Sequence, residues 1–224
     1  MIGRGGETNL HAHTHMDGMW FVLSGSLRFY SDETTIAGEL GRYEGILIPR
    51  GAQYWFEQVG EEPVEVLQIE CSDRPMTKDE ARAERADLNN VGFVPLPLAP
   101  FKYEFPEFNG KRAITWLAKT DRLFADVQVI GEGGETNLHA HPHLDGIWFV
   151  LSGKLKFYSD ETTLMGELGR HAGVVVPRGA PYWFEASGDE PVEVFQLECS
   201  DVPFTLEQAR SDRLDIKGSK RDLR

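Results

Sequence analysis

The sequence predicts an all-β protein of two homologous domains, each a sandwich or barrel of short antiparallel strands followed by a short helix. A long internal repeat and short β-rich runs separated by turn residues predict this fold class. Shifting the sequence by 128 residues aligns 3–77 with 131–205, with 54 identities among 75 positions. A repeat of this length indicates a duplicated domain rather than a solenoid, whose units run about 20–50 residues.

The strands of each copy follow from residue patterns in the first copy. The stretch 20–33 contains two β-rich segments separated at Ser24–Gly25. The stretch 45–51 is apolar and stops at Pro-Arg-Gly, and 63–70 alternates apolar and polar residues with a period of two. These patterns predict short strands, of which the last is half-buried.

The ends of the copies predict further elements. The charged stretch 78–88, with its partner near the C-terminus, predicts a helix that closes each domain. Residues 112–130 predict two further strands ahead of the second copy, whereas the first copy has only Met1–Ile2 in their place. We therefore expect the first domain to lack its opening strands, because the start is late or because another segment or subunit fills that edge.

The domain boundaries are predicted from the same patterns. An N-terminal domain covers 1–90, a proline-rich connector 91–111, and a C-terminal domain 112–224. Four prolines among apolar and aromatic residues in 92–110 predict an extended, ordered connector that docks on a surface.

Composition and charge exclude several classes of function. Hydrophobic residues make up 41% of the chain, and no apolar run approaches the roughly 18 residues of a membrane span. The net charge of −13 argues against binding nucleic acid through its phosphates. No secretory signal is visible, and we interpret Cys71 and Cys199 as two small core residues rather than a disulfide. We expect a cytoplasmic protein that acts on a small molecule, without nucleic acid or membrane partners.

Six of the seven histidines lie in one repeated motif. The stretch NLHAHTHMDG at 9–18 returns as NLHAHPHLDG at 137–146. Because a strand alternates its faces, His11, His13 and His15 point the same way while the strand lasts. Two imidazoles at i and i+2 can reach one transition metal ion. The alternative is that these histidines are exposed or hydrogen-bonded on a polar strand.

These motifs resemble those of the cupin superfamily, and their repetition resembles a bicupin. The first family motif, a glycine followed by HxH and a closing glycine, matches Gly5, His11, His13 and Gly25, and again Gly133, His139, His141 and Gly153. The second, PxG followed by a ligand position, matches Pro49, Gly51 and Tyr54, and again Pro177, Gly179 and Tyr182. The resemblance implies two jelly-roll antiparallel β-barrels, each with one divalent metal near its mouth.

Two family ligands are replaced in both copies. The glutamate position falls on Gly18 and Gly146, and tyrosines replace the second-motif histidine. The candidate metal ligands are His11, His13, His15, Tyr54, His139, His141, His143 and Tyr182. The candidate substrate-binding residues are Asn9, Trp20, Phe56, Asn137, Trp148 and Phe184. The alternatives are a water-facing His15, a Tyr54 hydroxyl that binds substrate or water, and aromatic residues that form barrel core.

The resemblance implies a metal-dependent bicupin that acts on a small organic substrate, aromatic or diketone-like. It favours dioxygenase-type chemistry slightly, with one Fe, Cu, Zn, Ni or Mn ion per domain. The alternatives are a non-catalytic sensor or storage cupin that binds a small molecule, and a cupin isomerase or lyase. We also expect a homodimer, since cupin domains commonly pair.

Overall fold

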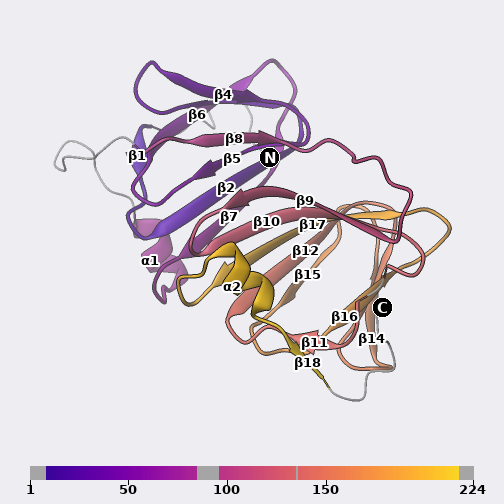
Figure 1. The fold of residues 1–224 in the computed structure, drawn as a ribbon. Helices are drawn as coiled ribbons and strands as arrows, with labels where there is room; N and C mark the ends of the chain where they lie inside the picture. The colour runs from indigo at the N-terminus through magenta and orange to yellow at the C-terminus, as the bar shows by residue number, and fades with distance from the viewer. Residues whose placement is uncertain (1–8, 85–95, 135, 217–224) are drawn as a thin grey trace. The chain divides into compact units, whose positions relative to one another are not determined.

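The protein is described by a computed structural model that covers residues 9–84, 96–134 and 136–216. The chain divides into two compact units, Met1–Glu104 (unit 1) and Phe105–Arg224 (unit 2), so the boundary falls inside the predicted connector. Both units consist mainly of strands (Figure 1), which confirms the predicted all-β class. The Met1–Ile2 stretch and the end of the predicted 78–88 helix lie outside the described residues.

Unit 1 contains two antiparallel sheets, ordered β1-β6-β3-β4 and β7-β2-β5-β8. Their strands are β1 (His11–Ala12), β2 (Met16–Ser24), β3 (Ser26–Tyr30), β4 (Ile36–Leu40), β5 (Glu44–Ile48), β6 (Gln53–Val59), β7 (Glu65–Ser72) and β8 (Ala99–Lys102). Alternate residues of these strands form one buried core that includes Trp20, Phe29, Ile46 and Phe56. The helix α1 (Lys78–Ala83) follows β7 and begins with a capping box at Thr77.

The predicted break at Ser24–Gly25 is confirmed, because β2 ends at Ser24 and β3 begins at Ser26. Gly25 has φ 76°, and a Cβ there would lie 2.9 Å from the carbonyl oxygen of Pro63. Only glycine therefore fits this turn without strain.

The connector contributes a strand to unit 1. β8 pairs antiparallel with β5, with Phe101 opposite Gly45. A Cβ at Gly45 would lie 2.3 Å from the Phe101 ring, so the glycine leaves the space that the ring fills. Residues 99–102 of the predicted connector are thus extended and pair with unit 1. β8 lies at the β5 edge, however, and within the described part of unit 1 no strand lies beyond β7.

Unit 2 repeats this plan with two added strands. Its sheets are ordered β15-β12-β17-β10-β9, β14-β13-β16 and β11-β18. The strands are β9 (Arg112–Lys119), β10 (Leu123–Ile130), β11 (His139–Ala140), β12 (Leu144–Ser152), β13 (Leu155–Tyr158), β14 (Leu164–Leu168), β15 (Gly173–Val176), β16 (Trp183–Ala186), β17 (Val192–Ser200) and β18 (Leu214–Asp215). The helix α2 (Leu206–Ser211) follows β17 and has a capping box at Thr205. The two strands predicted in 112–130 are confirmed as β9 and β10.

The added strands enclose the interior of unit 2. β10 pairs with β17 on one side and with β9 on the other, and every residue of β10 is buried. The core of the unit includes Ile130, Trp148, Phe157 and Val194. Because β10 and β17 pair along their whole length, the inward residues of both strands lie on the same side of the sheet.

Two sequence-level expectations concern the environment of the protein. Neither Cys71 nor Cys199 is a free thiol in the structure, which contradicts the interpretation of two unpaired core cysteines. No helix in the described ranges is long and apolar enough to cross a membrane.

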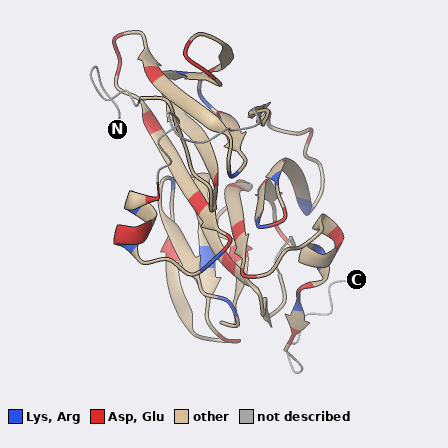
Figure 2. Ribbon diagram, turned by 90° about the vertical axis from the view of Figure 1, so that its left-hand side faces the viewer, with Lys and Arg blue, Asp and Glu red and all other residues tan. Residues whose placement is uncertain are grey.

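Acidic residues outnumber basic ones, 36 to 23, and Figure 2 shows Asp and Glu spread over the ribbon.

We predict that Phe101→Ala lowers the free energy of unfolding of unit 1 by about 2 kcal/mol. The ring is half-buried and stacks on Phe21 with centroids 6.4 Å apart, so its removal leaves β8 attached mainly by backbone hydrogen bonds. Urea unfolding would measure the loss, and protease cleavage within 96–104 should become faster. Wild-type cleavage rates in the variant would contradict this account of β8.

Candidate functional site

The first residue of each HxH motif lies in a short strand beside the tyrosine of the second motif. In unit 2, His139 and Tyr182 exchange backbone hydrogen bonds of 3.0 and 2.8 Å. Their ring centroids lie 4.3 Å apart, and the His139 and His141 rings are 5.1 Å apart. Unit 1 repeats this geometry, with 5.1 Å between His11 and His13. The structure therefore brings two imidazoles and one phenol together in each unit.

Backbone carbonyls engage one nitrogen in three of these four imidazoles. Nδ1 of His139 lies 2.7 Å from the Asn137 oxygen, and Nδ1 of His11 lies 2.8 Å from the Asn9 oxygen. Nδ1 of His13 contacts the Glu84 carbonyl oxygen. Since a carbonyl only accepts, each of these Nδ1 atoms carries the proton, and the lone pair is on Nε2. A metal-binding histidine typically has this arrangement.

Glu84 also fixes the loop that carries His13, a role that the sequence did not indicate. Its Oε1 accepts hydrogen bonds from the backbone N–H of Thr14 (2.8 Å) and His15 (3.2 Å). In unit 2, Oδ2 of Asp212 accepts from the His143 N–H at 3.0 Å. Both acids cap the C-terminus of the closing helix, so each helix holds the loop of its histidine motif.

His15 and His143 have different partners from the other motif histidines. Their Nδ1 atoms lie 3.1 Å from Asp73 and 3.0 Å from Asp201, respectively. Arg178 also contacts Asp201, at 2.6 Å. The structure thus places these two predicted ligands in partly exposed ion-pair networks.

The aspartates next to the missing glutamate position belong to the same networks. Asp17 accepts hydrogen bonds from the backbone and guanidinium of Arg50, at 2.8 and 3.0 Å. Asp145 accepts the matching bonds from Arg178. Both carboxylates therefore have arginine partners.

The glycines at the glutamate position differ in their surroundings. A Cβ at Gly146 would lie 2.3 Å from the indole ring of Trp148, so this ring fills the space where a side chain would begin. A Cβ at Gly18 would make ordinary contact with Ile48, at 3.8 Å. Trp20 and Phe56 belong to the buried core of unit 1. Their placement corresponds to the barrel-core alternative rather than to a substrate-binding role.

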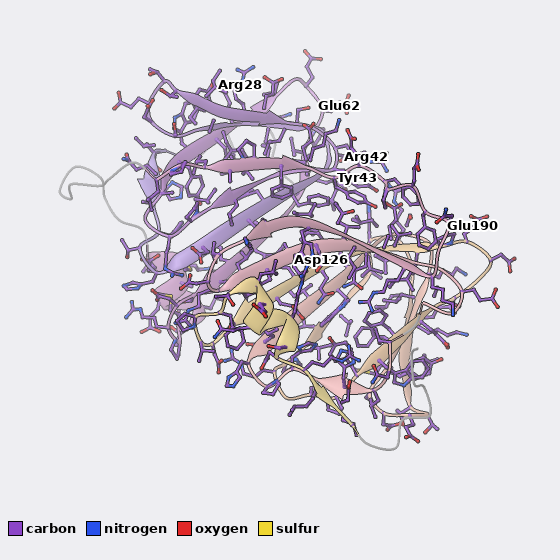
Figure 3. All side chains as sticks on the ribbon, viewed as in Figure 1. Arg28, Arg42, Tyr43, Glu62, Asp126 and Glu190 are labelled. Carbon is purple, nitrogen blue, oxygen red and sulfur yellow. The ribbon has the colours of Figure 1, made fainter. Side chains whose placement is uncertain are left out.

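Unit 2 has a cavity of about 330 Å³ at its histidine pair. His139, His141, Tyr182 and Phe184 were predicted for the site and line this cavity. The other lining residues were not predicted, and they are Arg112, Ile114, Trp116, Asp126, Gln128, Thr136, Gln196, Glu198, Ala209, Arg210 and Arg213. Asp126 (labelled in Figure 3) and Glu198 are buried carboxyls, 4% and 8% exposed.

Polar side chains connect the strands across this cavity. Arg112 donates to the Oε1 of Gln128 at 2.5 Å, and Gln128 donates to the side chain of Gln196. Gln196 in turn hydrogen-bonds the carboxyl of Glu198. The donors all point from Arg112 toward Glu198, so one chain of hydrogen bonds runs across β9, β10 and β17.

Burial controls the protonation of the cavity. It raises the pKa of Asp126 to about 7, against the opposing effects of a hydrogen bond from Gln128 and of the charges of Arg112 and Arg210. Burial, with the nearby Asp126 carboxyl, raises the pKa of Glu198 to about 8. Burial, with the charge of Arg213, lowers the pKa of His139 to about 3, and burial lowers the pKa of His141. It raises the pKa of Tyr182. Near neutral pH the cavity therefore holds neutral imidazoles, a phenol, and carboxyls poised to exchange protons.

The same sequence has another environment in unit 1. Gln68 and Glu70 match Gln196 and Glu198, and the Gln68 amide donates to Glu70 at 2.9 Å. Both are exposed, because no strand of the described part of unit 1 covers them as β10 covers β17. The polar cavity is therefore a property of unit 2.

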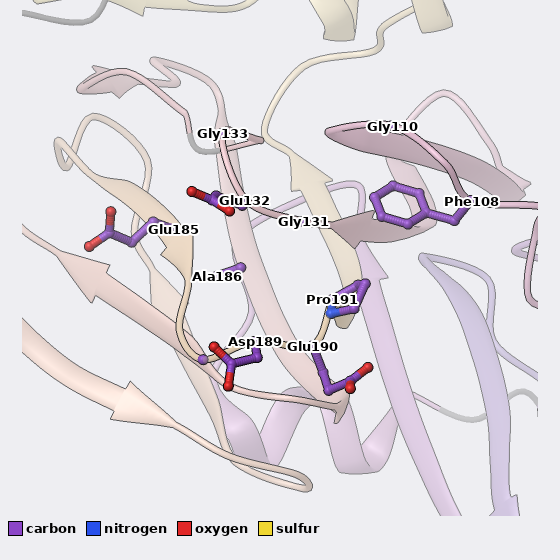
Figure 4. A pocket seen from close by; sticks show the side chains of 11 residues that line it. Phe108, Gly110, Gly131, Glu132, Gly133, Glu185, Ala186, Asp189, Glu190 and Pro191 are labelled. Atoms are coloured by element: carbon purple, nitrogen blue, oxygen red, sulfur yellow. The ribbon is translucent and has the colours of Figure 1, made fainter.

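A second, larger cavity of unit 2 lies away from the histidines. It measures about 680 Å³ and is lined by Phe108, by glycines, and by the carboxylates of Glu132, Glu185, Asp189 and Glu190 (Figure 4). Glu185 accepts a hydrogen bond from the Tyr158 hydroxyl at 2.9 Å.

The histidine pairs can supply two protein ligands to a metal. Among the described residues, no group of three His, Cys, Asp or Glu side chains is placed to hold one ion. The remaining coordination positions would fall to water, to a phenol or to a bound molecule.

Comparisons with known proteins agree with this architecture. Residues 126–198, which lie within unit 2, match the sequence model of the cupin domain. A search of curated proteins by sequence found no match. The structure is similar to the Cupin 2 conserved barrel domain protein from Leptotrichia buccalis, with 16% identity, coverage of 87% of this chain and 78% of that chain, and a TM-score of 0.58.

Oxalate decarboxylase of Bacillus subtilis, described with Mn(II) centres, is also similar. It shares 17% identity and a TM-score of 0.59, with coverage of 94% of this chain and 68% of that chain. A variant of that enzyme gives 15% identity, the same coverages and a TM-score of 0.60. At these identities the similarity shows the fold, which is that of cupin jelly-roll barrels.

We predict that Gly146→Ala destabilises the protein by about 1–3 kcal/mol, because the new methyl group overlaps the Trp148 ring. Gly18→Ala, the matched change in unit 1, should cost less than about 1 kcal/mol. Denaturant unfolding of both variants would measure the difference. Equal losses would contradict the different packing of the two glycines.

The buried carboxyls predict a pH dependence of stability. Between pH 4 and 7, folded Asp126 keeps a proton that the unfolded chain releases, so the free energy of unfolding falls as pH rises. This contribution is fully present below pH 4 and lost above pH 7. Asp126→Asn should reduce the slope by up to about 1.4 kcal/mol per pH unit in this window.

Urea unfolding of wild type and variant at pH 5, 6, 7 and 8 would test this expectation. The exposed carboxylate of Glu70 gives a control, because Glu70→Gln should leave the slope unchanged. A variant of Asp126 with the wild-type slope would show that this carboxyl ionises freely in the folded protein.

Proposed function

We propose that the protein is a metal-dependent bicupin enzyme that acts on a small polar organic molecule in the cavity of unit 2. The observation that carries the proposal is the convergence of His139, His141 and two titratable carboxyls on one cavity. A cavity of about 330 Å³ is at the small end of the range of ligand sites. Buried groups with shifted pKa values gather at catalytic sites more often than elsewhere.

His139 and His141 would hold the metal in unit 2, and His11 and His13 would hold it in unit 1. Neutral imidazoles suit Fe, Cu, Zn, Ni or Mn, and the pKa of His139, about 3, keeps it deprotonated and available as a ligand. The Mn(II) centres named for the Bacillus subtilis enzyme support a divalent ion. When bound, such an ion would supply Lewis-acid polarisation of a substrate oxygen.

The side chains of unit 2 favour proton-transfer chemistry. Asp126 and Glu198 have pKa values of about 7 and 8, near the values that suit a general acid or base at neutral pH. One carboxyl in its basic form would take a proton from the substrate, and a protonated carboxyl would return one. This reaction class comprises isomerases, lyases and decarboxylases.

Dioxygenase-type chemistry is the second candidate, and the pair of neutral imidazoles is the observation that favours it. A shell of two neutral ligands leaves positions for both oxygen and substrate. Turnover that requires oxygen would select this branch. Turnover under anaerobic conditions with exchange of substrate hydrogen for solvent deuterium would select proton transfer.

We predict about two equivalents of one transition metal per chain in protein purified without an affinity tag or chelator. The double variant His11→Ala, His13→Ala and the matched double variant His139→Ala, His141→Ala should each retain about one equivalent. Elemental mass spectrometry measures the content.

The double variant His15→Ala, His143→Ala is the control. It removes two imidazoles that pair with Asp73 and Asp201, and it should keep the metal content of the parent. A parent protein without metal would refute the proposed enzyme and favour a non-catalytic cupin that binds a small molecule.

A further inference from the structure

The cavity of unit 2 contains a guanidinium with unused hydrogen-bond donors. Arg112 begins β9 and is exposed, and its side chain makes one hydrogen bond within the described residues, to Gln128. A guanidinium has five N–H donors in a planar fork, so several remain available. The side chain lines the cavity and lies over the Phe184 ring, 5.8 Å from its centroid.

One oxygen of a second group in the same cavity also lacks a partner, although the Asp126 carboxyl is hydrogen-bonded by Gln128. Oδ1 of Asp126 is buried and has no hydrogen-bond partner among the described residues. Asp126 is 4% exposed, and Trp116 lies opposite it on β9. A buried polar atom without a partner costs free energy, so a polar group of a bound molecule at this position would stabilise the protein.

The charge around the cavity favours an anion. Three arginines line it, of which Arg213 is paired with Asp215 at 2.8 Å and Arg210 lies 4.9 Å from the Trp116 ring centroid. The two carboxyls of the lining are protonated over much of the range below neutral pH, as their raised pKa values require. A cation-rich cavity is unexpected in a chain of net charge −13.

We propose that unit 2 binds a small organic acid, with its carboxylate on Arg112 and a hydroxyl or carbonyl oxygen of the same molecule at Asp126. The planar fork of Arg112 matches a carboxylate through two parallel hydrogen bonds. Ile114, Trp116 and Phe184 supply apolar walls for the carbon atoms. This assignment names a substrate class and rests on the proposed function of the cavity.

The assignment applies to unit 2 alone. The described part of unit 1 has no strand at the position of β9 or β10, and hence no counterpart of Arg112 or Asp126. The two histidine pairs therefore differ in what they face.

The test uses the full chain freed of metal with a chelator, so that binding to a metal does not contribute. The melting temperature and the heat of binding are measured with sodium acetate, lactate and malonate, and with sodium chloride and inorganic phosphate at equal ionic strength. We expect at least one carboxylate to stabilise the protein more than chloride does. Arg112→Gln should weaken its binding about tenfold or more.

Two further variants complete the design. Lys119→Gln removes the same charge at the other end of β9, outside the cavity lining, and should bind like the parent. Arg112→Lys keeps the charge without the fork, should bind with intermediate affinity, and replaces Arg112→Gln if that variant does not fold. Binding by Arg112→Lys equal to that of the parent would overturn the bidentate assignment.

The other outcomes also decide the matter. Stabilisation by none of the three carboxylates beyond chloride would overturn the inference, as would phosphate binding tighter than carboxylate binding. Because the protein is metal-free in this assay, the result is separate from the metal content that tests the proposed function. Carboxylate binding lost in Arg112→Gln would sustain the inference even in a protein that holds no metal.

Discussion

The pairing of β10 with β17 is the interaction on which the candidate site depends. The two strands pair over eight residues, from Leu123 opposite Cys199 to Ile130 opposite Val192. This register places Asp126 opposite Gln196 and puts Glu198 on the same inward face. A slip of one residue would turn these polar side chains outward and bring Ala125 and Val127 inside.

The enclosed polar groups explain the unusual protonation of the cavity. A carboxyl that loses its contact with water is stabilised in the neutral form, and two carboxyls in one small space reinforce this effect. The amide chain from Arg112 through Gln128 and Gln196 partly opposes it, because its last donor hydrogen-bonds Glu198. Burying carboxyls so that their pKa values lie near neutrality lowers the free energy of unfolding. Destabilising arrangements of this kind tend to occur at functional sites.

Much of the fold could be predicted from the sequence. The repeat defined two equivalent units, and the break at Gly25 was visible because a turn with positive φ requires glycine. The proximity of His11, His13 and Tyr54 followed from strand alternation and from the family motifs. Local sequence patterns are sufficient to predict these features, because each feature depends on residues that are near in sequence or fixed by a motif.

The cavity could not be predicted in this way. Asp126 and Gln128 alternate with apolar residues in a strand that is buried on both faces, and Gln196 and Glu198 do the same in β17. Each polar residue alone is consistent with an exposed strand face, as Gln68 and Glu70 are in unit 1. Whether such a face is covered depends on a partner strand about 70 residues away, which a local pattern does not identify.

The comparison of the two units separates what the repeated sequence determines from what its surroundings determine. Both copies keep the HxH motif, the tyrosine and the Gln–Glu pair, with nearly the same ring distances between histidines. Only the second copy is preceded in the described chain by strands that bring Arg112 and Asp126 to the inner face. A duplicated histidine strand can therefore line a polar cavity in one unit, while its copy faces a different environment. The added strands thus determine the lining of the cavity as much as the histidines do.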